Sequence, residues 1–513
     1  MRVGIYNRWL ATLGGGEKHS LAIAEKLSQD HHVEVITHNP VQKSLAEERL
    51  NLDLARVEFV TIPDRHSIEM APVSAEYDLF INASYMDFFP CFAKKGMTLV
   101  YFPLKLNRGI AFKRKIKLYA RKWFKLPAIM AGFHAFHYDR DTFRWAADRV
   151  ISINLPASSR DYQVEFDLSS QQRGVCGATI LLNNHPIETL KFDGVNNPVR
   201  CQIIVPGSLP GENSKLTILA EGEAALDGKP KMEISRYTSN IPQYRIYQWL
   251  FEKLFRGMGI RLQYYPLGTT ILDYVDSYDL ILANSEYTRG WIRKYWGRES
   301  RVLYPAVEVE NYHPAEKQHY ILNVGRFFAG SHNKKHLEMI KAFKRMVNDG
   351  LTGWELHLAG STTPGMEHAI YLEEVTRAAQ GYPIYVHTNM PYQELLDLYS
   401  HSAIYWHASG FGEDEKKEPD KFEHFGITTV EAMAAGCVPV VIRKGGQPEI
   451  VRHEHNGLLW DTLDGLQDQT LRLIRDDVFR QRLSQAAVLA SAQYDKRHFD
   501  QRLDSLLHQI DIQ

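Results

Sequence analysis

The 513-residue chain lacks long hydrophobic runs and contains only four cysteines. No apolar stretch approaches the roughly 20 residues of a membrane-spanning helix, and the N-terminus lacks the apolar core of a signal peptide. The cysteines, which have no metal-ligand spacing, are Cys91, Cys176, Cys201 and Cys437. These absences predict a cytoplasmic protein of a reducing compartment, with a Cys176–Cys201 bridge as an open alternative.

The chain also lacks an excess of charge of either sign, internal repeats and low-complexity tracts. Its formal net charge is −1, which gives no reason to expect a nucleic acid as partner. What remains is the composition of a globular protein. Because 513 residues are too many for one ordinary core, we expect two or three domains.

Short buried strands alternate with helical patterns through most of the sequence. The predicted strands are residues 2–6, 33–37, 77–82, 97–101 and 278–285 in the first part, and residues 320–326, 354–359, 384–387 and 403–408 in the second. This alternation is typical of doubly wound parallel sheets, whose ligands bind at the carboxyl ends of the strands. The sequence therefore predicts two α/β domains.

Residues 155–240 follow a different pattern. Apolar and polar side chains alternate strictly from Tyr162 to Leu168, and Gly, Asn and Pro separate several further short strands. This pattern predicts a small antiparallel β domain of sandwich type. The α/β pattern resumes at Tyr244, so the β domain interrupts it. It binds carbohydrate or a partner, or it braces the fold, which is the simpler interpretation.

The strongest local signal lies between residues 421 and 439. Glu423 and Glu431 stand eight positions apart, and the second glutamate opens a predicted short helix. A helix N-terminus offers unpaired N–H groups and partial positive charge, which suit a phosphate. Gly426 lets the backbone approach a ligand closely. Taken alone, Thr428 followed by Glu431 is also a capping box, in which Glu431 stabilises only its own helix.

Two other loops have the form of phosphate-binding turns. A strand at residues 2–6, the glycines Gly14–Gly16 and a helix follow one another, although a tight turn has the same pattern. In the second half, Arg326 ends a strand, and Lys334 and Lys335 precede a helix. Arginine as a fork of donors and lysine as a point charge both suit a diphosphate.

Together these motifs resemble the retaining glycosyltransferases of family 4, which have the GT-B fold. The runs FGITTVEAMAAG at residues 425–436 and GGQPEIV at residues 445–451 carry the resemblance. It extends over the α/β parts, is strongest at residues 320–459, and does not include residues 155–240. It implies two Rossmann-like domains that face a cleft, with the antiparallel β domain inserted in the first.

The resemblance also implies roles for individual residues. Glu423 would face the donor sugar, and Glu431 would bind the nucleotide ribose. Arg326 and Lys334 would hold the donor diphosphate and stabilise the charge that grows on it. The implied catalytic set is Glu423, Arg326 and Lys334, and the implied donor-binding set is Gly15, Gly16, Gly426, Ile427, Thr428 and Glu431. No metal or other cofactor is implied, because GT-B enzymes do not depend on a metal.

Some features depart from the family pattern or extend it. Family members often carry a histidine where this sequence has Tyr101, which leaves the polar residue on the acceptor side unassigned. The charged loop at residues 413–421 is longer than in many relatives and is either a mobile lid that excludes water or a solvated loop.

The expected domain limits follow from these patterns. They are residues 1–154 with 241–312 for the first α/β domain, 155–240 for the inserted domain, 313–490 for the second α/β domain, and 491–513 for a terminal helix. This helix is expected to cross back to the first domain, as the resemblance implies. Its apolar face is formed by Phe499, Leu503, Leu506, Leu507 and Ile510.

Residues 105–125 are basic and contain no acidic residue. Aromatic side chains are mixed with the lysines and arginines. The segment is either an amphipathic surface for anionic lipid, with about 1 kcal/mol of attraction per charge, or a solvated helix with a buried aromatic face. A nucleic-acid partner is less favoured, because no other basic stripe accompanies the segment. The expected location is cytoplasmic, and the first interpretation adds a peripheral position at the inner membrane face.

The function implied by the resemblance is transfer of a sugar from a nucleotide diphosphate sugar to an acceptor hydroxyl, with retention of the anomeric configuration. The run His424–Ile427 is slightly closer to enzymes that use GDP-mannose, and UDP-sugars stay open as donors. The expected acceptor is a growing glycan, free or lipid-linked. The alternative is a non-catalytic scaffold of the same fold that binds carbohydrate or a nucleotide sugar. An epimerase and a phosphorylase are the enzyme alternatives.

Overall fold

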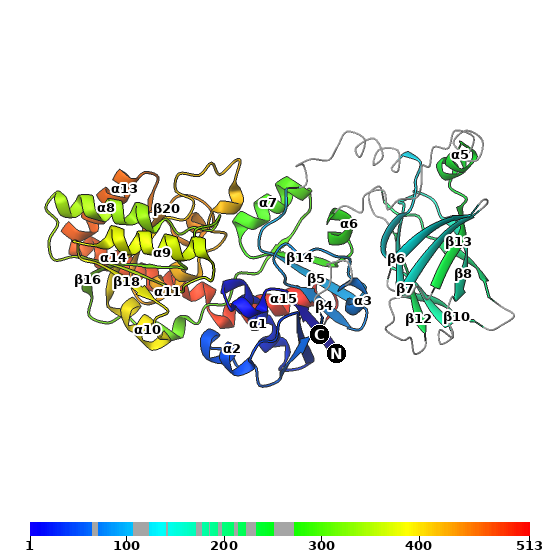
Figure 1. The fold of residues 1–513 in the computed structure, drawn as a ribbon, viewed down its shortest axis with the longest axis horizontal. Helices are drawn as coiled ribbons and strands as arrows, with labels where there is room; N and C mark the ends of the chain where they lie inside the picture. Colours follow the sequence, from blue (N-terminus) through cyan, green and yellow to red (C-terminus); the bar gives the residue numbers. More distant parts are fainter. Residues whose placement is uncertain are drawn as a thin grey trace.

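The computed structural model describes residues 1–63, 70–105, 123–139, 142–170, 177–183, 185–192, 197–209, 214–221, 232–250 and 271–512. These residues form three sheets, and the C-terminal and inserted domains lie on opposite sides of the N-terminal domain (Figure 1). No helix among them is long and apolar enough to span a bilayer. Most of the predicted basic segment, at residues 106–122, falls outside the described residues, and so does Cys176.

The N-terminal domain contains a seven-stranded parallel sheet with the order β15-β14-β5-β4-β1-β2-β3. Its strands are β1 (Arg2–Tyr6), β2 (His32–Thr37), β3 (Val57–Thr61), β4 (Leu79–Asn82), β5 (Lys95–Val100), β14 (Leu280–Ala283) and β15 (Arg301–Val302). Its helices are α1 (Gly15–Leu27), α2 (Lys43–Leu50), α3 (Ala71–Ser74), α6 (Ile271–Val275) and α7 (Glu286–Trp296). Strand β1 is buried from Val3 to Tyr6, as expected for a central parallel strand.

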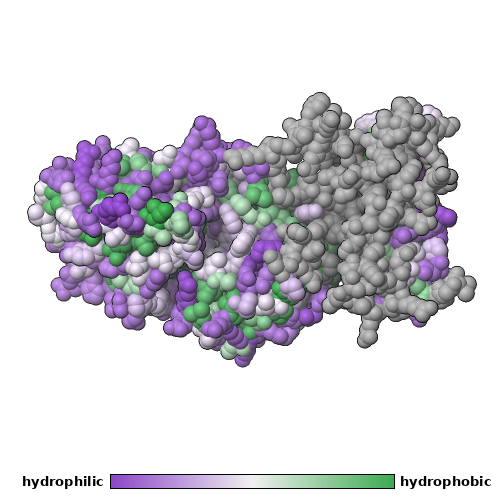
Figure 2. Space-filling view, in the orientation of Figure 1, coloured by the Kyte–Doolittle hydropathy of each residue, from purple (hydrophilic) through white to green (hydrophobic). Residues whose placement is uncertain are grey.

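The C-terminal domain contains a six-stranded parallel sheet with the order β18-β17-β16-β19-β20-β21. Its strands are β16 (Gln318–Val324), β17 (Glu355–Gly360), β18 (Ile384–Thr388), β19 (Ser402–His407), β20 (Val438–Ile442) and β21 (Leu458–Trp460). The helices are α8 (His336–Asn348), α9 (Met366–Ala379), α10 (Tyr392–His401), α11 (Ile427–Ala434), α12 (Gln447–Ile450), α13 (Leu463–Arg475), α14 (Asp477–Ser491) and α15 (Lys496–His508). Its face in Figure 2 is mostly hydrophilic, with apolar residues in small patches.

The inserted domain is an antiparallel sheet of eight strands between β5 and β14. The strands are β6 (Ala128–Asp139), β7 (Thr142–Leu155), β8 (Tyr162–Ser170), β9 (Gly177–Leu182), β10 (His185–Lys191), β11 (Val199–Val205), β12 (Ser214–Glu221) and β13 (Met232–Ser239), followed by α5 (Pro242–Leu250). Strand β7 joins the two halves of this sheet, because it pairs with β12 through residues 150–155 and with β13 through residues 144–147. Strands of both halves contribute to one hydrophobic core. Two parallel sheets and an inserted antiparallel domain confirm the predicted fold class.

The inserted domain is larger than the predicted range of residues 155–240. Strands β6 and β7 lie before this range and pair with each other between residues 128 and 154. Beyond it, Tyr244 and Tyr247 of α5 pack into the core of the domain. The predicted start was too late because apolar and polar residues do not alternate strictly in β6 and in the first part of β7.

Lys215 of β12 fastens the inserted domain to the N-terminal domain. Its Nζ donates to the carbonyl oxygen of Cys91 and lies 5.2 Å from the centroid of the Phe92 ring. Burial lowers the pKa of the Lys215 ammonium group. Leu219 packs against the N-terminal cluster that contains Phe89. The described part of the inserted domain is thus held against the N-terminal domain, away from the C-terminal domain (Figure 1).

Helix α15 crosses from the C-terminal domain back to the N-terminal domain. The apolar face from Phe499 to Ile510 packs into the same core as Val3 and Leu21. Charged pairs reinforce the contact, since Lys496 pairs with Glu25 and Lys26 lies 3.4 Å from Asp504. The last helix of the chain therefore completes the core of the first domain.

Truncation of Leu503 to alanine tests this contact. Leu503 is fully buried, so Leu503→Ala leaves a cavity and should lower the free energy of unfolding by about 2–5 kcal/mol. The control is Leu489→Ala on α14, whose side chain is 79% exposed and which should change stability little. Thermal unfolding followed by circular dichroism compares the two. Equal melting temperatures of both variants would contradict the docking of α15.

Candidate functional site

Helix α11 begins directly after Gly426, which is its N-cap residue. Gly426 has a φ of +121°, and a Cβ there would lie 2.3 Å from the side-chain nitrogen of Gln447, so only glycine fits. No side chain caps the helix, and its first N–H groups have no intrahelical acceptor. The start of α11 therefore has the form of an anion-binding site at the carboxyl edge of the sheet.

The predicted start of this helix at Glu431 is wrong, because α11 begins at Ile427 and Glu431 lies in its interior. The capping-box interpretation of Thr428 and Glu431 fails for the same reason. Instead, the Tyr399 hydroxyl donates to Glu431 Oε2 at 2.9 Å, and the Tyr405 hydroxyl lies 2.7 Å from Thr428 Oγ1. Glu431 is thus one turn inside the helix, on a face that two tyrosines approach.

A second helix N-terminus, that of α1, faces α11 from the N-terminal domain. A Cβ on Gly15 would lie 3.0 Å from Ile427 Cδ1, so the two helix starts nearly touch. The first turn of α1 is held by Tyr101, whose hydroxyl donates to the carbonyl oxygen of Gly16 at 2.6 Å. Burial raises the pKa of Tyr101, which keeps the phenol protonated. Tyr101 therefore fixes the glycine turn in place.

Glu423 lies between a lysine and a histidine. Lys334 Nζ donates to Glu423 Oε2 at 2.5 Å, and His407 Nε2 lies 3.1 Å from the same oxygen. Burial alone would raise the pKa of Glu423, but the Lys334 charge and the His407 hydrogen bond hold it well below its usual range. The carboxylate is therefore ionised and fixed at the end of β19, where a strong hydrogen-bond acceptor is available to a ligand.

The two neighbouring lysines have different partners in the structure, and no described carboxylate forms an ion pair with Arg326. Lys335 Nζ donates to Glu413 Oε1 at 2.8 Å, so Lys334 alone of the two reaches Glu423. The guanidinium group of Arg326 lies 5.6 Å from the centroid of the Phe328 ring, and Arg326 is exposed. Its donors are free to bind an anion beside Lys334.

The charged loop at residues 413–421 is tied down at several points. Glu413 accepts from Lys335 and from Lys421, at 2.8 Å and 3.1 Å. Glu415 Oε1 accepts from the backbone N–H of Gly445 at 3.0 Å. The loop is thus closed over the start of the Gly445–Val451 run, and whether it opens as a lid stays a prediction.

A buried charge cluster, which the sequence patterns did not indicate, lies near Glu431. Lys18 of α1 forms an ion pair with Glu308, in the segment between β15 and β16, and their side chains are only 13% and 4% exposed. Burial lowers the pKa of Lys18, but the charges of Glu308 and Glu431 raise it by more. Lys18 therefore stays charged and ties α1 to the segment between β15 and β16, near the predicted ribose residue.

Aromatic rings join the two α/β domains around His332 and His424. The His424 ring stacks on Phe102 with centroids 4.5 Å apart. The His332 ring lies 5.7 Å from the His424 ring and 6.3 Å from that of Tyr85. We call this contact region the interdomain seam; its residues are Gly15, Tyr85, Phe102 and Tyr287 of the N-terminal domain, and His332, His424 and Ile427 of the C-terminal domain.

His332 is a polar site residue that the sequence analysis did not single out. Burial lowers its pKa, and Lys334 and Arg326 lower it further, so the imidazole is neutral at pH 7. A neutral ring can both donate and accept a hydrogen bond. Among the described residues no hydrogen-bond partner of His332 is present. The only sequence signal was its position in the polar loop between Arg326 and Lys334.

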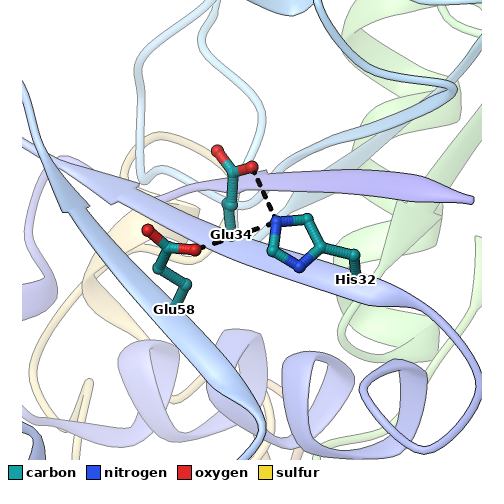
Figure 3. Close-up of side chains that lie close together, drawn as sticks. All are labelled: His32, Glu34 and Glu58. Carbon is teal, nitrogen blue, oxygen red and sulfur yellow. Dashed lines mark hydrogen bonds and ion pairs between the residues drawn. The ribbon is translucent and has the colours of Figure 1, made fainter.

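Metal-ligating side chains gather elsewhere, at the starts of β2 and β3. In the described part of the chain, His32, Glu34 and Glu58 come within ligand distance of one another (Figure 3). Glu34 is already satisfied, because Arg2 donates to both of its oxygens, at 2.8 Å and 3.1 Å, and Tyr77 donates at 2.8 Å. The cluster therefore links the amino ends of neighbouring strands by ion pairs and hydrogen bonds. The glycine turn before α1 lies at the opposite, carboxyl ends of the strands.

Comparison with known families and proteins places this site in context. The family model described as "Glycosyl transferases group 1" matches residues 308–489. A GDP-Man:Man(3)GlcNAc(2)-PP-Dol alpha-1,2-mannosyltransferase of Xenopus laevis is 27% identical over 224 residues, which is 40% of this chain and 43% of that protein. An alpha-1,3/1,6-mannosyltransferase of Rhizomucor pusillus is 28% identical over 215 residues, 35% of this chain and 46% of its own length. This chain thus matches less than half the length of these curated relatives.

Two solved glycosyltransferase structures align with almost the entire length of the chain. A glycosyltransferase from Rickettsia africae has a TM-score of 0.52 at 10% identity, covering 99% of this chain and 98% of its own. Anabaena HepE in complex with UDP has a TM-score of 0.53 at 11% identity, covering 99% and 100%. At this identity the likeness concerns the fold alone. The two parallel α/β domains and these neighbours establish the GT-B fold.

Substitution of Gly426 tests the geometry of the α11 start. Gly426→Ala meets both the unfavourable φ and the Gln447 side chain, so it should lower the free energy of unfolding by more than about 2 kcal/mol. The matched control is Gly412→Ala, with a φ of +82° and no heavy atom within 4 Å, which should cost about 1 kcal/mol. Urea unfolding compares the variants. A Gly426→Ala variant as stable as Gly412→Ala would refute the crowded turn.

Proposed function

We propose that the protein is a retaining glycosyltransferase of family 4 that transfers a hexose from a nucleotide diphosphate sugar to an acceptor hydroxyl. One observation carries the proposal: the Lys334–Glu423 ion pair stands directly before the open start of α11, within the matched glycosyltransferase group 1 region. A helix start and a lysine suit a diphosphate, and an ionised carboxylate suits sugar hydroxyls.

The positive groups would act on the leaving nucleoside diphosphate. Negative charge grows on this group as the bond to the sugar breaks, so preorganised donors lower the barrier. Arg326 and the start of α11 at Gly426–Thr428 would bind phosphate oxygens. Lys334 has three N–H donors and can hold Glu423 and a phosphate oxygen at the same time. Gly15 and Gly16 would let the N-terminal domain approach the donor closely.

The two glutamates would position the rest of the donor. Glu423, fixed by Lys334 and His407, would accept hydrogen bonds from hydroxyls of the donor sugar. Glu431 would accept from the ribose hydroxyls, with Tyr399 holding its other side. Reaction on the front face of the sugar needs no side-chain nucleophile, so none is assigned.

GDP-mannose is the donor that we favour, and a lipid-linked glycan is the favoured acceptor. The names of the relatives from Xenopus laevis, Xenopus tropicalis and Homo sapiens give GDP-Man as donor and Man(3)GlcNAc(2)-PP-Dol as acceptor. The run His424–Ile427 favours the same donor, with UDP-sugars as the alternative. A lipid-linked acceptor would bring a cytoplasmic enzyme to the membrane surface, in line with the basic sequence of residues 105–125.

No metal ion is required in this proposal. Metal-dependent transferases use a cation to neutralise the diphosphate. Here Arg326, Lys334 and the dipole of α11 would supply that positive charge. Transfer should therefore persist in the presence of a chelator such as EDTA.

A binding and turnover assay tests the function. A thermal-shift series with GDP, UDP and ADP should give selective stabilisation by GDP, since a ligand that binds only the folded protein raises its melting temperature. Release of GDP from GDP-mannose with a lipid-linked oligosaccharide should then be observed. Glu423→Gln should abolish transfer and keep GDP binding. Binding without transfer by the unaltered protein, across acceptors and donors, would favour the scaffold alternative.

The adjacent lysines offer a matched test of the diphosphate site. Lys334→Ala removes a charge-assisted contact and should weaken GDP binding about 10- to 100-fold, whereas Lys335→Ala should change it less than about threefold. Isothermal titration calorimetry with GDP measures both affinities. Circular dichroism establishes that both variants are folded. Equal losses in the two variants would contradict the role assigned to Lys334.

A further inference from the structure

Glu449 of α12 reaches from the C-terminal domain to the start of helix α7 in the N-terminal domain. Its Oε2 accepts from the backbone N–H of Glu286 at 2.8 Å, and its Oε1 accepts from that of Tyr287 at 3.1 Å. The hydroxyl of Tyr304 also donates to Oε2, at 3.2 Å. One half-buried carboxylate thus receives three donors, all from outside its own α/β domain.

The helix start that Glu449 binds is well formed by itself. Ser285 is the N-cap of α7, and its side chain accepts from the backbone N–H of Thr288. Ser285 leaves the first two N–H groups of the helix, at Glu286 and Tyr287, without an intrahelical acceptor. Glu449 satisfies both of them, and a carboxylate at a helix N-terminus also gains from the helix dipole. The cap of α7 is therefore shared between two domains.

Tyr287 makes the reciprocal contact. Its hydroxyl donates to the carbonyl oxygen of Pro419 at 3.0 Å, in the charged loop of the C-terminal domain. Its ring stacks on His424 with centroids 6.5 Å apart, and His424 directly follows Glu423. Residues at the first turn of α7 are thereby held from both sides by the C-terminal domain. This arrangement sets the distance of the N-terminal domain from Glu423.

We propose that Glu449 is a positioning residue that clamps α7 and holds the two α/β domains in the closed arrangement. The inference rests on the proposed transfer for its catalytic consequence, because the donor site lies in the C-terminal domain and the glycine turn at Gly15 belongs to the other. The clamp also assigns a contact to Glu449, a residue of the Gly445–Val451 run. Glu449 itself would touch neither the donor nor the acceptor.

The clamp is coupled to protons near neutral pH. Burial raises the pKa of Glu449 to about 7, against the pull of the two backbone N–H groups and Tyr304. In an open arrangement of the two domains, the exposed carboxyl group of Glu449 would have an ordinary pKa. Closure therefore takes up a proton. As a result, closure is favoured below pH 7 and weakens as the pH rises through 7. The charged and titratable groups around Glu449 are Glu286, Tyr304, Tyr494 and Arg502. Of these, Glu286 forms an ion pair with Arg289.

Solution scattering tests the clamp independently of activity. Glu449→Ala should increase the radius of gyration, because the helix start loses its acceptor and the domains separate. The matched control is Glu286→Ala, which removes a neighbouring carboxylate and keeps the backbone N–H that Glu449 binds, and it should leave the radius unchanged. Glu449→Gln serves if the alanine variant does not fold, and should abolish the change in radius between pH 6 and pH 8. The proposal would be overturned by a folded Glu449→Ala variant that keeps the radius of the unaltered protein, or by a Glu449→Gln variant whose radius still changes between pH 6 and pH 8.

Kinetics separate a positioning role from a structural one. With GDP-mannose as donor, Glu449→Ala should lower kcat/KM about 10- to 100-fold. The affinity of the variant for GDP should equal that of the unaltered protein within error. The melting temperature of its C-terminal domain should also be unchanged. Tyr287→Phe should give a smaller loss of the same kind, since it removes only the contact with Pro419. If the unaltered protein transfers no sugar, the proposed function is wrong. The scattering experiment still shows whether Glu449 holds the two domains together. Equal loss of GDP affinity and transfer would overturn the positioning role.

Discussion

The open N-terminus of α11 is the feature on which the rest of the site depends. Gly426 turns the chain with a φ that other residues rarely adopt, and Gln447 fills the space where a side chain would stand. This turn sets Glu423 before the helix and Glu431 inside it. The ion pair with Lys334 then draws the loop after β16 to the same place. Parallel strands, which end at one edge, bring these separate loops together.

The sequence predicted those parts of the molecule that local periodicity controls. Alternating strands and helices identified both α/β domains, and the strict alternation from Tyr162 to Leu168 identified the inserted domain. Local patterns could not distinguish Lys334 from Lys335, because adjacent lysines differ only in what they contact in three dimensions. The clamp of Glu449 joins residues 163 positions apart, and no period in the chain reports such a contact.

The inserted domain occupies the end of the molecule opposite to the C-terminal domain (Figure 1). It is held there through Lys215 and Leu219, which contact the N-terminal domain. In this position the N-terminal domain lies between its described residues and the C-terminal domain (Figure 1). In the chain, the insertion is flanked by β5 and β14, which are neighbours in the N-terminal sheet.

The path of α15 has a consequence for the order in which the protein is made. The core around Val3 and Leu21 is closed by residues 499–512, which leave the ribosome after the entire C-terminal domain. A nascent N-terminal domain therefore lacks these apolar partners while the second domain is synthesised, and apolar surface exposed in this way is prone to aggregation. The domain that is synthesised first is the last to become fully folded.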